Sequence, residues 1–157
     1  MPVRRSCLGF AAALLAGTAL ASPALAQCTP LRNNADLAIS VPMVNFDTPT
    51  YIDFDNGSIV YQQTVTLSVQ APGNRPWTVC VSSDVPDLGT VDGFTKPLAD
   101  LQWQAGSGPW TPVSLVPQPL TTERGDRTIQ VRVRMLLTWG ADPPGSFGTM
   151  VNFTVAG

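Results

Sequence analysis

The feature that most constrains the fold is a strict alternation of apolar and polar residues in the last third of the chain. The residues between the apolar ones are mostly polar and include Arg132 and Arg134. Successive side chains of a β-strand point to opposite faces of the sheet, so a period of two predicts a long, half-buried strand with a solvated polar face. The apolar positions are Ile129, Val131, Val133, Met135, Leu137 and Trp139.

The same period of two recurs along most of the chain and predicts an all-β domain. No window carries the apolar stripe of period 3.6 that marks an amphipathic helix. About eight short strands separated by Gly and Pro turns favour an antiparallel, immunoglobulin-like β-sandwich of about seven to eight strands. The further candidate strands are 37–43, 51–54, 64–70, 76–82, 101–104, 110–115 and 147–155.

Turn residues divide these candidate strands. Asn56-Gly57 tolerates the positive φ angles of a tight β-hairpin, and 71–74 and 105–108 are further Gly-containing breaks. The stretches 84–98 and 116–127 show no strong alternation, and we interpret them as loops of the same domain.

The first 26 residues predict a cleaved signal peptide. Arg4 and Arg5 supply the positive start, residues 8–20 form a short apolar run, and Ala24-Leu25-Ala26 is an A-x-A cleavage site. The expected mature chain is therefore a single β-sandwich domain, residues 27–157. It contains no second apolar run long enough to span a membrane.

Two cysteines remain after the expected cleavage, and we predict that they form a disulfide. Cys28 and Cys80 are an even pair in an exported chain, where oxidation is the default. A metal-binding or reactive thiol pair is disfavoured because the chain has no histidine and no C-x-x-C spacing. Cys80 alternates with Val79 and Val81, so its thiol is expected to point away from the main core unless a bulge intervenes.

Charge and composition exclude several classes of function. The chain carries 9 Lys+Arg against 11 Asp+Glu, so it lacks the basic surface that nucleic acids and anionic membranes require. The absence of histidine removes Ser-His-Asp and Cys-His catalysis and His-ligated metals. We therefore predict a protein that is not an enzyme and uses no cofactor or metal.

Two groups of acidic residues are candidates for chemical sites. The run from Asp53 to Gly57 resembles the start of a calcium loop, but its glycine comes one residue early and position 64 is Thr instead of a bidentate Glu. A hairpin is the favoured interpretation. A hydrolase built on paired carboxylates is disfavoured, because the other Asp residues are scattered through loops and Glu123 is the chain's one glutamate.

Four tryptophans raise the alternative of sugar binding, because flat aromatic faces stack on pyranose rings. Trp77, Trp103 and Trp139 share the phase of apolar neighbours and are predicted to lie in the core. Trp110 follows a Gly-rich turn and is the candidate ligand contact. The strand arginines Arg132 and Arg134 are assigned to solvation and edge protection.

Three segments resemble spore coat protein U and fimbrial-subunit domains. These are an N-terminal cysteine followed by 44–51, the strand end Val79-Cys80-Val81, and the closing segment 143–155. The resemblance implies an exported immunoglobulin-like sandwich, of a kind that a chaperone and usher assemble into surface fibres. Such pilins borrow a strand from a neighbour's N-terminal extension.

The chain departs from that pattern at both ends. Residues 27–36 are mostly polar, include Pro30 and are tethered at Cys28, so they would make a poor donor strand. Residues 155–157 lack the penultimate aromatic residue of many pilins.

Together these features predict an exported bacterial protein of the periplasm, cell surface or extracellular space. Its predicted role is structural or interactive, in adhesion or a fibre, with a protein partner on the envelope and no nucleic acid. One alternative is a fimbrial subunit that accepts a strand; another is a carbohydrate-binding module that uses Trp110.

Overall fold

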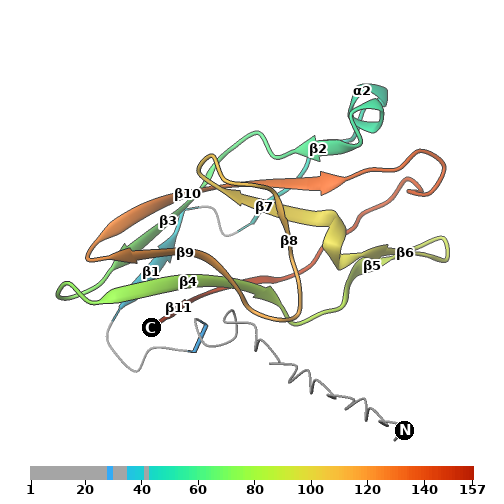
Figure 1. Cartoon of the computed structure of the whole chain (residues 1–157). Helices are drawn as coiled ribbons and strands as arrows, with labels where there is room; N and C mark the ends of the chain where they lie inside the picture. The colour runs from blue at the N-terminus through green and yellow to red at the C-terminus, as the bar shows by residue number, and fades with distance from the viewer. Residues whose placement is uncertain (1–27, 30–34, 41–42) are drawn as a thin grey trace, which may run out of the picture.

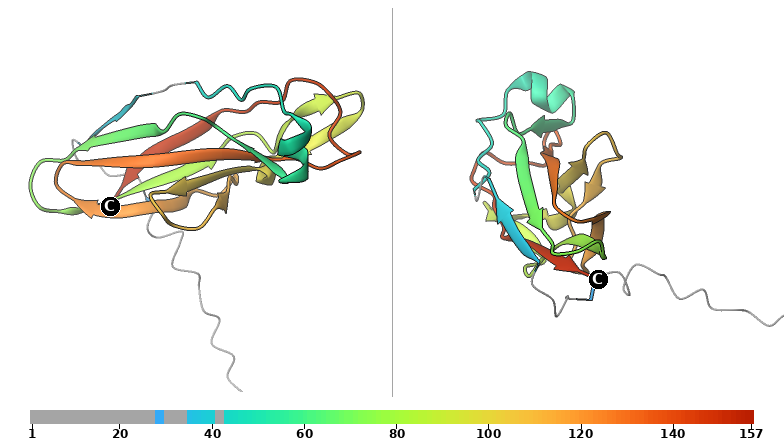
Figure 2. Two further views of the ribbon diagram at one scale, coloured as in Figure 1. Left: turned by 90° about the horizontal axis from the view of Figure 1, so that it is seen from above. Right: turned by 90° about the vertical axis from the view of Figure 1, so that its left-hand side faces the viewer.

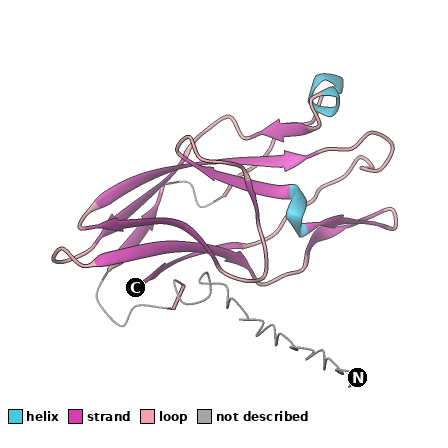
Figure 3. Ribbon diagram, in the orientation of Figure 1, coloured by secondary structure: helices cyan, strands magenta, loops and turns pink. Residues whose placement is uncertain are grey.

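A computed structural model describes residues 28–29, 35–40 and 43–157 of the chain (Figure 1). The expected signal peptide, residues 1–26, lies outside this part. The described residues form eleven strands, β1 to β11, joined by loops and two short helices (Figure 3). Among these residues no helix is both long and apolar enough to cross a membrane.

The larger sheet is built around the longest strand, β10 (Arg127–Leu136), which is the run of alternating residues that dominates the sequence. One edge of β10 pairs first with β3 and then with β2, and the other edge pairs with β7. All of these pairings are antiparallel. The sheet order is β1-β3-β10-β7-β8, with bounds β1 Asp36–Ile39, β2 Ser58–Val60, β3 Val65–Gln70, β7 Leu101–Ala105 and β8 Thr111–Pro112.

The second sheet has three strands in the order β11-β4-β9, and β4 lies at its centre. A separate hairpin, β5-β6, extends from one end of the molecule (Figure 1). The bounds are β4 Pro76–Ser83, β9 Gln118–Arg124, β11 Val151–Ala156, β5 Asp87–Val91 and β6 Phe94–Pro97.

The core lies between the two main sheets and consists of the side chains that the alternation places inside. Leu67 and Val131 of the larger sheet and Val79 of the smaller one are fully buried. The expected antiparallel β-sandwich is confirmed, and so is the burial of Trp77 and Trp103. The remaining members of the buried cluster are Val65, Val69, Val81, Leu88, Leu98, Val113, Leu120 and Ile129.

Two stretches that were interpreted as loops contain strands. Within 84–98, β5 and β6 form a hairpin that turns at Asp92-Gly93, where both φ angles are positive (49° and 81°). This is the tight hairpin that an Asp-Gly pair favours. Within 116–127 lies β9, an edge strand in which Leu120 is the one buried side chain, so it shows almost no alternation.

The expected strand at 51–54 and the hairpin at Asn56-Gly57 are wrong. The helix α2 (Tyr51–Asp55) occupies this region, Asn56 caps its C-terminal end, and Gly57 leaves it with φ 69°. Thr50 and Asp53 form a capping box at the helix start. That local pair stabilises the turn of helix in a stretch too short to show a helical stripe.

Trp139 is not in the core, contrary to the prediction. Strand β10 ends at Leu136 and the chain turns away after the buried Leu137, which leaves Trp139 60% exposed. Its ring lies against Phe54 with centroids 4.7 Å apart, and its indole N–H donates to Asp55 over 3.0 Å. The alternation therefore continues in the sequence for three residues after the strand has ended.

The predicted disulfide is present between Cys28 and Cys80, whose Cα atoms are 5.8 Å apart. The pairing of β4 with β9 contains a register shift beside Cys80, and the extra residue lies on β9. Strand β4 itself stays regular. Cys80 therefore alternates with the core residues Val79 and Val81, and the disulfide lies on the opposite face of the sheet.

Candidate functional site

The site is built on β11, an edge strand of the smaller sheet. It pairs antiparallel with β4 along its whole length, from Val151 opposite Ser83 to Ala156 opposite Thr78. In the described residues no strand pairs with its other edge. Just beyond the strand, the Gly157 N–H donates to the Thr29 carbonyl over 3.3 Å, so the described N-terminal residues lie at the end of β11.

The inward side chains of β11 are incompletely covered. Val151, Phe153 and Val155 pack against the core cluster, yet each is only half-buried. Their partners on β4 are almost completely buried: Val79 opposite Val155, and Val81 opposite Phe153. The two strands have the same face toward the core. The difference arises because β4 has a neighbour on both sides, whereas the described residues place none at the outer edge of β11.

Strand β1 of the larger sheet comes close to β11 without pairing with it. Figure 2 (right) shows β1 in cyan and β11 in red at the same side of the sandwich. The inward side chain of Leu37 on β1 is also only half-buried against the core. We call this region, bounded by β1 and the segment 43–49 on one side and by 142–156 on the other, the seam.

The seam widens into a cleft beyond the start of β11. The cleft has a volume of about 570 Å³ and lies between the segments 44–49 and 142–147, with the end of β10 as part of its wall. Val44, Phe46 and Phe147 supply apolar surface to it. The lining is mixed, since Asn45, Lys96 and Asp142 add polar groups to it. A cleft that continues a strand edge can hold side chains of an extended peptide.

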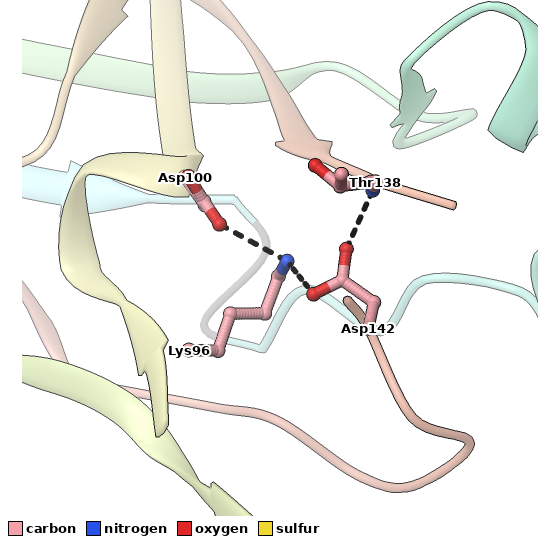
Figure 4. Close-up of polar contacts among 4 residues, drawn as sticks. All are labelled: Lys96, Asp100, Thr138 and Asp142. Carbon is pink, nitrogen blue, oxygen red and sulfur yellow. Dashed lines mark hydrogen bonds and ion pairs between the residues drawn. The ribbon is translucent and has the colours of Figure 1, made fainter. Parts of the chain in front are cut away.

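A buried ion cluster forms one wall of the cleft (Figure 4). Lys96 of β6 is completely buried, and its Nζ lies 2.7 Å from Oδ1 of Asp142 and 3.1 Å from Oδ2 of Asp100. The second oxygen of Asp142 accepts the Thr138 backbone N–H over 2.7 Å. The ring of Phe147 lies 5.8 Å from the same Nζ. The cluster connects β6, the short helix η1 (Leu98–Asp100) and the loop after β10.

The sequence did not lead to a prediction of this cluster, although its single lysine was a possible signal. Lys96 is the chain's only lysine, among eight arginines. It lies in a stretch interpreted as a loop, where a solvated side chain would be ordinary. Nothing in the spacing of Asp100 and Asp142 indicates that both converge on it.

Trp110, the candidate ligand contact, lies beneath the two strand arginines. The Arg134 guanidinium lies 4.5 Å from the centre of its ring and that of Arg132 lies 5.6 Å away. Arg134 also donates two hydrogen bonds to Gln102, of 2.9 and 2.6 Å. The arginines therefore cover one face of Trp110 and reduce the flat surface on which a sugar ring could stack.

The carboxylates of Asp53 and Asp55 accept hydrogen bonds from residues of the chain itself. The Thr50 hydroxyl donates to Asp53 over 2.7 Å, and this bond, with a second from the Thr50 backbone N–H, holds the pKa of Asp53 below its ordinary value. Asp55 accepts from Trp139. No group of three or more Cys, Asp or Glu side chains that could hold a metal ion occurs in the part of the chain that the structure describes.

Comparison with known proteins gives one structural similarity. No protein-family model matches the sequence, and a search of curated proteins found no match. Among solved structures, the chain is similar to one from the structure of a chaperone-usher pilus. The similarity has a TM-score of 0.47 and 12% sequence identity, and covers 98% of this chain and 99% of the other.

Proposed function

We propose that this chain is an exported structural domain of the bacterial cell envelope that accepts an extended segment of a partner protein along the seam. The observation that carries the proposal is that no strand in the described part of the chain pairs with the outer edge of β11, whose core-facing Val151, Phe153 and Val155 are only partly buried. This favours the strand-accepting alternative over a sandwich in which every core strand is paired within its own chain.

An added extended strand would supply both backbone hydrogen-bond partners and a cover for the inward side chains of this edge. Its backbone would pair with the free N–H and C=O groups of β11, and its alternate side chains would cover the half-buried residues beneath. The cleft at the end of the seam would take a further side chain of the same segment. The partner segment is therefore alternately apolar, without proline in its central part.

The N-terminal segment of a second copy does not fit this description. Residues 27–36 are mostly polar and include Pro30, and Cys28 is joined to Cys80 on the outer face of the sheet. The partner is accordingly a different protein. A subunit that accepts a strand and offers none would terminate a fibre.

The test is a variant of the full chain that supplies the missing strand itself. A short flexible linker and an alternately apolar strand of about seven residues are added after Gly157, so that the tail can fold back antiparallel to β11. We expect this tail to raise the melting temperature by at least about 5 °C, because it buries apolar surface that the free chain exposes.

The matched control carries the same tail with every apolar residue replaced by Ser. We expect no stabilisation by this tail, because its backbone could pair but its side chains could not fill the seam. Equal melting temperatures for the two tails would show that the seam does not accept an apolar strand, and would contradict the proposal.

Export, and a position in the periplasm or at the cell surface, belong to the same proposal and derive from the signal sequence at residues 1–26. We also propose that the domain has no catalytic role. The glycan-binding alternative has no specific observation in its favour, because Arg134 covers one face of Trp110.

A further inference from the structure

The buried cluster around Lys96 combines the groups needed to form an amide bond between two side chains. The cluster holds one amine and two carboxylates within 3.1 Å of it. We propose that Lys96 and Asp142 condense into an isopeptide bond, with Asp100 as the group that carries the proton. This inference is independent of strand acceptance at β11.

The reacting atoms are already close to one another. The Lys96 Nζ lies 2.7 Å from Oδ1 of Asp142, and the carboxyl carbon is one C–O bond beyond, so the nitrogen is within about 4 Å of the carbon it would attack. The side chains are 1% and 6% exposed, respectively. Little movement is therefore needed to reach a reactive geometry, and water has little access to the two reacting side chains, whereas Asp100 is 26% exposed.

The reaction requires the uncharged forms of the amine and the carboxyl group. An ammonium and a carboxylate in contact can exchange a proton to become a neutral amine and a carboxylic acid, which are less costly to desolvate. The Phe147 ring beside Nζ adds apolar surface on that side. After that exchange the Lys96 nitrogen would carry a lone pair 2.7 Å from the Asp142 carboxyl oxygen.

Asp142 is also positioned for the tetrahedral intermediate. Its Oδ2 accepts the Thr138 backbone N–H over 2.7 Å, and this donor would stabilise the negative charge that develops on the oxygen. Its Oδ1 contacts the Lys96 Nζ, which also contacts Oδ2 of Asp100. One oxygen is therefore held as the oxyanion while the other is free to leave.

The step balances without any further reactant. A proton passes from the Lys96 ammonium to Oδ1 of Asp142, and Nζ attacks Cγ to form the C–N bond. Asp100 takes a proton from the nitrogen and returns it to Oδ1, the Cγ–Oδ1 bond breaks, and one water leaves. Asp100 ends as the carboxylate it was at the start. No group is oxidised or reduced.

The product would link β6 covalently to the loop that follows β10. That loop leads into the cleft and then into β11, so the bond would fix one wall of the seam. Unlike the Cys28–Cys80 disulfide at the other end of the seam, an amide is not broken by thiols.

The test is peptide mass spectrometry of the full chain, purified from the periplasm and digested with trypsin after reduction. We expect a cross-linked species that joins the peptide containing Lys96 to the peptide beginning at Met135, lighter than their sum by one water. Because the chain has a single lysine, the fragment spectrum assigns the bond without ambiguity. Two separate peptides of unmodified mass, from a chain that circular dichroism shows to be folded, would overturn the proposal.

Three substitutions test the role of each group. Lys96→Arg keeps the charge and the ion pair but has no amine that can lose its proton, and we expect no cross-link. Asp142→Asn should still react but lose ammonia in place of water. Asp100→Asn should reduce the yield at least tenfold while the chain stays folded. A cross-link of unchanged yield in Asp100→Asn would exclude Asp100 as the proton carrier.

Discussion

The two edge strands of the smaller sheet, β9 and β11, pair with opposite sides of β4 and are protected in different ways. Strand β9 carries Pro119, the charged pair Glu123 and Arg124, and a bulge against β4. Strand β11 has no proline and no charge, and its pairing with β4 is regular. Proline, charge and bulges are the devices by which natural sheets discourage edge pairing. Strand β9 therefore carries the features of a permanent edge, whereas β11 carries none of them.

The largest expected effect in this sheet comes from the disulfide, which holds the N-terminal segment on β4 between the two edges. Replacing both Cys28 and Cys80 with Ala opens a loop of 52 residues and should cost about 4 kcal/mol of the free energy of unfolding. Urea denaturation measures this loss. The double variant should still be stabilised by the apolar tail. Loss of that response would mean that the disulfide shapes the seam itself.

Val79 of β4 and Val155 of β11 lie opposite each other, so the same Val→Ala substitution at each position compares how completely the two side chains are buried. Val79→Ala should cost about 2–3 kcal/mol, because the side chain is fully buried in the core. Val155→Ala should cost about 1 kcal/mol in the free chain, because the side chain is already half-exposed. Urea denaturation of both variants measures the difference.

In the chain with the apolar tail, the cost of Val155→Ala should rise toward that of Val79→Ala. Equal costs in the free chain would mean that β11 is already covered, and the comparison between the two edges would fail.

A charged residue on β11, like those that β9 carries, should remove the stabilisation by the added strand. Phe153→Lys places a charge on the inward face of β11, where an incoming strand would have to bury it. The apolar tail should then raise the melting temperature by less than about 1 °C. Thr154→Lys, on the exposed face of the same strand, is the control and should leave the full response. If Thr154→Lys abolished the rise in melting temperature and Phe153→Lys preserved it, the added strand would not pair along β11.

The smallest effect is expected at β9. Glu123 forms an exposed ion pair with Arg127 over 3.6 Å, and such pairs contribute little. Glu123→Gln should change the free energy of unfolding by less than about 0.5 kcal/mol, as measured by urea denaturation. It should leave the apolar tail's stabilisation unchanged. A large loss would show that β9 depends on this pair more than an exposed edge strand should.

The sequence predicts the sandwich well wherever one face of a strand is buried and the other solvated. Strand β10 and the core positions of β3 and β4 follow from alternation alone, and the Cys28–Cys80 bridge was predicted from an even pair of cysteines in a chain expected to be exported. Strand β9 was missed because an edge strand with one buried residue has no pattern to detect. Helix α2 was missed because a local capping box determines it.

The candidate site was less predictable, because its defining features are relations between distant segments. In the described residues the outer edge of β11 has no partner because the other strands pair elsewhere, and alternation within β11 does not show which strands will pair with it. The convergence of Lys96, Asp100 and Asp142 depends on the β5-β6 hairpin, which was interpreted as a loop. The burial of Trp139 was wrongly predicted for a different reason. Trp139 continues the alternation in the sequence, but the strand ends at Leu136.

Residue-resolved amide hydrogen exchange across β11 in the untailed full chain tests directly whether the outer edge of this strand is free. If the outer edge is free, amides bonded to β4 should exchange slowly and the alternate, outward-facing amides of Val151–Ala156 should exchange fast. Adding the apolar tail should slow the outward-facing set. Uniformly slow exchange along β11 in the untailed chain would mean that this edge is already paired, and would contradict the account.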